Sequence, residues 1–79
     1  DFREAMTVML DPLAMTFFDT EHSQDEERWI SVGRSNEGAL LLVVHTFTAT
    51  GPNSALVRII SARAATRNER RQYEQGTLQ

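Results

Sequence analysis

Arginine supplies all eight basic side chains of this 79-residue chain, and five of the eight lie in one stretch near its C-terminal end. These five are Arg58, Arg63, Arg67, Arg70 and Arg71. A guanidinium group is always charged and presents its N–H donors as a rigid planar fork, which fits the oxygens of a phosphate better than lysine does. The stretch therefore indicates binding or chemistry at a phosphodiester.

Charge is divided unevenly between the two parts of the chain. Residues 1–27 contain eight acidic residues against Arg3 alone, a net charge of −7, whereas residues 28–79 contain seven arginines against three glutamates, a net charge of +4. A polyanion responds to the local potential more than to the overall charge, so the net charge of −3 does not exclude nucleic acid. The alternative is that the two parts neutralise each other in the fold.

The N-terminal part predicts a helix followed by a short extended segment. Apolar residues recur at helical spacing in residues 1–10, and the predicted apolar face consists of Phe2, Ala5, Met6, Met9 and Leu10. Asp11-Pro12 ends this helix, because the residue before a proline is pushed out of the α region. Residues 13–18 form a short apolar segment, which favours a strand, and residues 19–27 are predicted to form an acidic loop.

Three further segments have the character of strands. Residues 28–35 have the alternation of a strand, with one set of side chains on each side. Residues 39–47 are almost continuously apolar, as in a central strand, and residues 55–61 are predicted to form the last strand. A tight hairpin turn at residues 36–38 contains a glycine. Residues 48–54 are predicted to be a longer surface connection, of the kind that folds tolerate as an insertion.

A second helix follows the last strand. Thr66 and Glu69 have the spacing of a capping box, and Gly76 is placed to end the helix. The order of elements predicts an α+β fold in a single domain over residues 1–79, with a small antiparallel sheet of three to four strands and flanking helices.

Several kinds of site are disfavoured by composition. The chain has no cysteine, which excludes disulfides and thiolate zinc sites, and its two histidines lack the spacing of metal ligands. No apolar run approaches the roughly 20 residues that span a membrane. We therefore expect a cytoplasmic protein without a metal or other cofactor.

The arginine-rich stretch carries a family resemblance. From Arg58 to Glu74 the chain reads RIISARAATRNERRQYE, which resembles the C-terminal signature of the BrnT family, the ribonuclease toxins of type II toxin–antitoxin modules. Residues 11–14, 26–35 and 42–46 are similar to that family in the same order. The resemblance covers essentially the whole chain, although family members usually begin with a strand and a helix that this chain lacks.

This resemblance implies a fold like that of RelE-type ribonucleases, namely a small twisted antiparallel sheet with helices packed on it. It also implies RNA cleavage that inhibits translation. The implied partner is a cognate antitoxin, BrnA, which binds the toxin in a heterotetramer and contacts operator DNA through its own DNA-binding part.

Four residues are candidates for catalysis. Arg63, expected just past the last strand, could stabilise charge on the scissile phosphate, or it could be a surface arginine paired with an acid. His45 could be a general base, although a histidine within a strand is more often structural. Glu27 and Arg28 open a strand and could form a general base with its orienting partner, or equally an exposed pair at the strand end. Tyr73 could transfer a proton or stack on a base, although a lone tyrosine near a C-terminus is more often a packing residue.

The most economical hypothesis is an endoribonuclease that needs no metal and uses the 2′-hydroxyl of the RNA as nucleophile. Arg58, Arg67, Arg70 and Arg71 would then bind RNA phosphates. The alternative is a non-enzymatic interaction subunit, whose arginine-rich helix binds an acidic partner protein.

Overall fold

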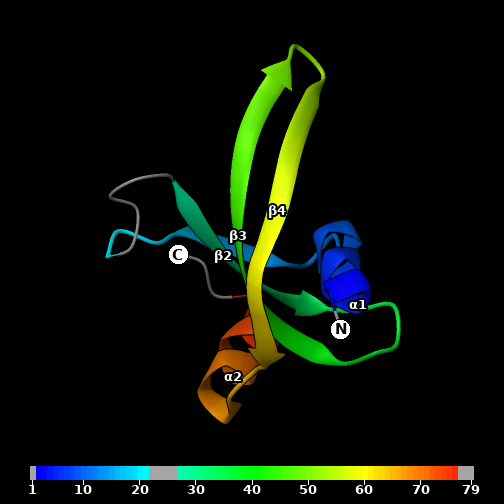
Figure 1. Ribbon diagram of the computed structural model, residues 1–79. Coiled ribbons are helices and arrows are strands. Elements are labelled where there is room, and N and C mark those ends of the chain that lie inside the picture. The colour runs from blue at the N-terminus through cyan, green and yellow to red at the C-terminus, as the bar shows by residue number, and fades with distance from the viewer. Residues whose placement is uncertain (1, 22–26, 77–79) are drawn as a thin grey trace.

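The computed structural model describes residues 2–21 and 27–76, and its elements follow the predicted order (Figure 1). These elements are helix α1 (Phe2–Thr7), the 3-10 turn η1 (Val8–Leu10), strands β1 (Met15–Phe18), β2 (Arg28–Arg34), β3 (Leu40–Gly51) and β4 (Ser54–Ala64), and helix α2 (Arg67–Gln75). The strands form one antiparallel sheet in the order β1-β2-β3-β4. The α+β prediction is confirmed, while part of the predicted acidic loop lies outside the described residues.

The two helices pack on opposite faces of the sheet. Ala5 and Val8 from the N-terminal helical segment bury themselves against Val43 of β3. On the other face, Tyr73 of α2 joins a cluster that includes the neighbouring residue Leu42. Because successive side chains of a strand point to opposite faces, Leu42 and Val43 mark two separate small cores.

The predicted apolar face of the first helix is only partly correct. Ala5 is fully buried, as predicted. Val8, which was not predicted to lie on the apolar face, is also fully buried, whereas Met6 and Leu10 are 42% and 80% exposed. Val8 fits there because it lies against Gly33 of β2, where an added Cβ would come within 2.9 Å of the Val8 side chain. Close contact with the sheet at a glycine, rather than helical periodicity, sets which side of the helix is buried.

The predicted long connection over residues 48–54 is wrong. Strand β3 continues to Gly51 and β4 begins at Ser54, so that only Pro52 and Asn53 form the turn. The two strands project beyond the rest of the sheet as a two-stranded ribbon (Figure 1). Threonines and small residues in this segment suit paired strands as well as a loop, which is why composition misled here.

Asp11 joins three elements at the end of the first helical segment. One carboxylate oxygen accepts hydrogen bonds from the backbone N–H of Arg34, at 2.8 Å, and from the hydroxyl of Tyr73, at 2.6 Å. The other oxygen accepts from the N–H of Leu13 at 2.9 Å. The guanidinium of Arg34 lies over the Tyr73 ring, 5.7 Å from its centre. Asp11 thus connects the helix end, β2 and α2.

These hydrogen bonds shift the pKa values of both partners. Burial alone would raise the pKa of the Asp11 carboxyl, but the bonds from Arg34, Tyr73 and Leu13 outweigh it and lower the pKa below its ordinary 3.8. The hydrogen bond to Asp11, together with burial, raises the pKa of the Tyr73 hydroxyl. Asp11 is therefore an ionised acceptor at neutral pH.

Replacing Tyr73 by phenylalanine removes this hydroxyl and keeps the ring. At pH 7 we expect Tyr73→Phe to lower the free energy of unfolding by about 1.5–3 kcal/mol, as for other hydrogen bonds to charged groups. Because the pKa of Asp11 is lowered by folding, its stabilising contribution is present above the unfolded pKa and is lost as pH falls through the folded pKa. Urea denaturation at pH 7 and at about pH 2 should show a smaller loss in acid. An equal loss at both pH values would contradict this account.

Candidate functional site

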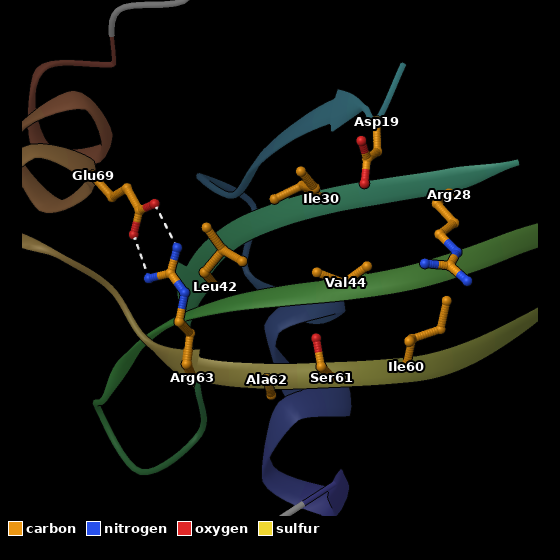
Figure 2. Close-up of a pocket in the computed structure, with 10 residues that line it drawn as sticks. All are labelled: Asp19, Arg28, Ile30, Leu42, Val44, Ile60, Ser61, Ala62, Arg63 and Glu69. Carbon is orange, nitrogen blue, oxygen red and sulfur yellow. Dashed lines mark hydrogen bonds and ion pairs between the residues drawn. The ribbon is translucent and has the colours of Figure 1, made fainter. Parts of the chain in front are cut away.

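A groove of about 550 Å³ lies on the α2 side of the sheet, where α2 leaves the strands uncovered (Figure 2). Its floor is mostly apolar and its charged groups lie toward its two ends. The floor is formed by the side chains of Ile30, Leu42, Val44, Ser61 and Ile60 and by the backbone of Ala62, whose side chain packs on the opposite face of the sheet. The charged groups are Arg63 and Glu69 at one end and Arg28 and Asp19 at the other, so the groove is a largely aliphatic surface with an arginine and a carboxylate at each end.

A β-bulge in β4 decides which arginines share this face. Val44 pairs with Ser61 and His45 pairs with Ile59, so Ile60 is an extra residue on β4. Arg58 and Arg63 are five residues apart and would face opposite sides of a regular strand. Their partners on β3 are four residues apart, however, so both arginines lie on the groove side of the sheet.

Arg28 lies in the same row as Arg58. Both residues pair with Thr46 of β3, one from β2 and the other from β4. Directly paired residues project from the same face, so the row places two arginines on the groove side, on either side of the central strand. In Figure 2 the side chain of Arg28 extends from β2 across β3 toward Ile60, at the end of the groove opposite Arg63.

Arg63 lies within β4 rather than just past it, and it is bound by Glu69 of α2. Its Nη1 and Nη2 atoms donate to the two carboxylate oxygens of Glu69, each at 2.9 Å, and Nη1 also donates to the backbone carbonyl of Ala64 at 3.1 Å. These contacts occupy one end of the guanidinium fork. Among the described residues none accepts from Nε–H or from the second Nη2 hydrogen, and Figure 2 shows this edge turned from Glu69 toward Leu42 and the floor.

The ion pair has a consequence for charge. The hydrogen bond from Arg63 lowers the pKa of Glu69, and the same bond raises the pKa of Arg63. Both groups are therefore charged over the physiological range. The side chain of Arg63 is 52% exposed, so the pair contributes little to stability, but it fixes the direction of the fork.

Glu69 also holds the beginning of α2. Its carboxylate accepts from the N–H of Thr66 at 2.9 Å, and its own N–H donates to the Thr66 hydroxyl at 3.2 Å. The predicted capping box is confirmed, and Gly76 ends the helix in the left-handed conformation. Sequence reasoning treated Glu69 only as a helix cap. Its second role is to bind Arg63. The only signal for that role in the sequence is an arginine that was expected close to the start of the helix.

The arginines of α2 lie apart from the groove lining. Arg70 makes an i,i+4 contact of 3.8 Å with Glu74, and both side chains are about half exposed. Arg67 and Arg71 are exposed and have no hydrogen bond or ion pair within the described part of the chain. The structure therefore separates the predicted cluster into a sheet group, Arg58 and Arg63, and a helix group.

His45 lies on the opposite face of the sheet from Arg63. It is 4% exposed, its Nε2 lies 2.8 Å from the hydroxyl of Ser31, and its Nδ1 lies 3.2 Å from the carbonyl of Thr46. The Ser31 hydroxyl is also 2.9 Å from that of Thr16. One tautomer satisfies all of these contacts, with Nδ1–H donating and Nε2 accepting. The structure does not bring His45 and Arg63 together.

Tyr73 and Glu27 are also absent from the groove lining. Tyr73 is buried and donates its hydroxyl to Asp11, so it serves the packing of α2. Glu27 is exposed and lies immediately before β2, next to Arg28. Of the four catalytic candidates, only Arg63 lines the groove, where it is joined by Asp19, Ser61 and Glu69, which sequence reasoning had not selected.

Neither a metal cluster nor a membrane helix emerges from the described residues. In ranges 2–21 and 27–76, no three His, Cys, Asp or Glu side chains come together in a way that could hold a metal ion. The helices there are all too short and too polar to cross a membrane.

Comparison with known proteins identifies the family. Residues 1–69 match the family model described as the ribonuclease toxin BrnT of type II toxin–antitoxin systems. No curated protein matches the chain. The matched region contains the whole sheet, the groove arginines and the start of α2 with Glu69. The chain therefore belongs to the BrnT family of ribonuclease toxins.

Proposed function

We propose that this chain is an endoribonuclease toxin that cleaves RNA in the cytoplasm without a metal ion and thereby inhibits translation. The observation that supports this most directly is the free edge of Arg63. Glu69 and Ala64 hold the guanidinium so that Nε–H and one Nη2–H face the groove. Two parallel donors of this kind match two oxygens of a phosphate.

Cleavage would proceed through the RNA itself. The 2′-oxygen attacks the adjacent phosphorus and loses its proton, while the bond to the 5′-oxygen of the next nucleotide breaks and that oxygen takes up a proton. The products are a 2′,3′-cyclic phosphate and a 5′-hydroxyl. Arg63 would bind the oxygens of the phosphoryl group, where negative charge accumulates in the transition state.

The other arginines would position the strand. Arg28 and Arg58 lie on the groove face and would contact neighbouring phosphates, while Arg67, Arg70 and Arg71 would attract RNA from the surface of α2. Such contacts fix the substrate in a reactive geometry.

Proton transfer is the weaker part of the proposed mechanism. His45 and Tyr73 are engaged elsewhere in the fold, and both oxygens of Glu69 already accept hydrogen bonds. Glu27, exposed beside Arg28, remains our candidate for moving a proton. We therefore propose a catalyst of modest rate, which relies on charge stabilisation and positioning.

The partner would be a protein antitoxin, because the family belongs to type II systems. We propose that it resembles BrnA, that it neutralises the toxin in a heterotetramer, and that operator DNA is contacted only through it. Free toxin and the complex should then differ in their effect on growth.

Arg63→Ala should reduce RNA cleavage by about a hundredfold or more, as loss of one transition-state donor does elsewhere. Arg63→Lys should also be impaired, because an ammonium group cannot form the fork. The thermal unfolding midpoint should change little, since the Arg63 side chain is 52% exposed and such pairs contribute little to stability. Arg71→Ala is the matched control and should weaken cleavage only slightly. If Arg63→Ala unfolds, or if both Arg63 variants are fully active, Arg63 does not have the proposed role in catalysis. If the wild-type chain does not cleave RNA, the alternative of a non-enzymatic interaction subunit is favoured.

Glu69→Gln separates the two roles of Glu69. Glutamine can retain the capping box but cannot form the charged bidentate pair with Arg63. We expect kcat to fall roughly tenfold, while RNA binding is unchanged or tighter because a negative charge is removed. Thr66→Ala is the control, since it should lower stability by about 1 kcal/mol and leave kcat almost unchanged. A parallel decrease in stability and kcat for both variants would make Glu69 a structural residue only.

Cleavage should persist in excess EDTA, because the proposed chemistry uses arginine to offset charge on the phosphate. The measurement is the rate of cleavage of a defined RNA before and after extensive treatment with chelator. Complete loss of activity that magnesium or manganese restores would overturn the metal-independent mechanism.

A further inference from the structure

We propose that the apolar floor of the groove binds an unstacked base of single-stranded RNA, between phosphates held by the arginines at its two ends. This inference rests on the proposed ribonuclease function and assigns a part of the site that phosphate contacts leave unexplained. It makes single-stranded RNA, rather than a duplex, the substrate class.

The floor is an uncovered continuation of the core. Ile30 and Val44 pack against the α2-side cluster on one side and remain partly exposed on the other. Ile60, the bulge residue, is also partly exposed and closes the floor along β4. Covering an aliphatic surface with a flat apolar ring removes both from water, which is favourable. A nucleobase presents such a ring, whatever its identity.

The arginines set the length of strand that the groove can hold. Arg63 pairs with Leu42, whereas Arg28 and Arg58 pair with Thr46, four residues further along β3. At the usual rise of a strand, these positions are about 13 Å apart. This span is too long for one phosphate group to contact the arginines at both ends, so two different phosphates are needed. A strand bound at both ends therefore has at least one complete nucleotide over the floor.

A duplex could not use the floor in this way. Bases of an A-form helix are paired and stacked, and the helix presents phosphates, riboses and a shallow minor groove to a protein. It could contact the arginines but would leave the aliphatic residues without an apolar partner. An arginine at each end, Arg63 beside Glu69 and Arg28 beside Asp19, would bind linked phosphates of one strand, with its base turned toward Val44 and Ile60.

The test measures binding to three RNA ligands at one fixed salt concentration, since phosphate contacts depend strongly on salt. The ligands are a short single strand, a fully paired duplex of the same sequence, and the same single strand without its internal bases. All carry 2′-O-methyl groups, so that they cannot be cleaved. Ile60→Ser and Ile60→Ala change the floor, and Leu56→Ser is the matched control, because Leu56 is on the same strand but 63% exposed and outside the groove. Thermal unfolding identifies which variants fold.

We expect the wild-type chain to bind the single strand roughly tenfold more tightly than either the duplex or the abasic strand. Each folded Ile60 variant should lose most of that preference, with little change in binding of the abasic strand, and Leu56→Ser should behave as wild type. This pattern would show that the base and Ile60 act together.

Equal binding of all three ligands, with Arg63→Ala still weakening them, would refute the base site and leave the ribonuclease proposal intact. Absence of both RNA binding and cleavage would instead remove the ribonuclease proposal, and the base site with it. If a glutamate-rich peptide bound more tightly than RNA and only its binding were weakened by Ile60→Ser, the floor would be a protein-docking surface and the inference would be wrong.

Discussion

The position of α2 on the sheet is the constraint on which the groove depends. Two side-chain interactions connect the helix to the rest of the fold near its two ends. Near the C-terminal end, Tyr73 donates to Asp11 and fills one of the small cores. At the N-terminal end, Glu69 binds Arg63 of β4. Because α2 covers only one end of the sheet, Ile30 and Val44 remain accessible, and the helix contributes Glu69 to the edge of the open surface.

The two faces of the sheet carry different polar groups. One face carries α1 and the satisfied hydrogen-bond chain of Thr16, Ser31 and His45. The other carries the arginines, with the bulge at Ile60 bringing Arg58 and Arg63 to the same side. A chain of this size has a thin core and exposes much of its sheet. The open part of the α2 face is where we propose that RNA binds.

Several charged side chains have partners that lie close to them in the fold. Within residues 2–21 and 27–76, the ion pairs of α2 are Arg63 with Glu69 and Arg70 with Glu74, and both join residues of the C-terminal part of the chain. Asp11 uses its carboxylate for a tyrosine and two backbone N–H groups. Arg28, Arg58 and Arg63 all lie on the face of the sheet where we propose that RNA binds.

The sequence alone determined the order of elements, the capping box at Thr66 and the family, because these depend on local spacing and on residue types along the chain. It did not determine how far β3 extends, since Thr48 and Thr50 suit a strand or a loop and only the pairing of β3 with β4 decides between them. It also could not place Arg58 on the same face as Arg63, because regular alternation would put them on opposite faces and the bulge between them is a property of the paired strands. His45 and Tyr73 looked reactive in sequence, yet tertiary packing gave their polar atoms partners on the opposite face and at the helix end. Local patterns fix elements, whereas the direction in which a side chain points, and what it meets there, is decided only when those elements pack.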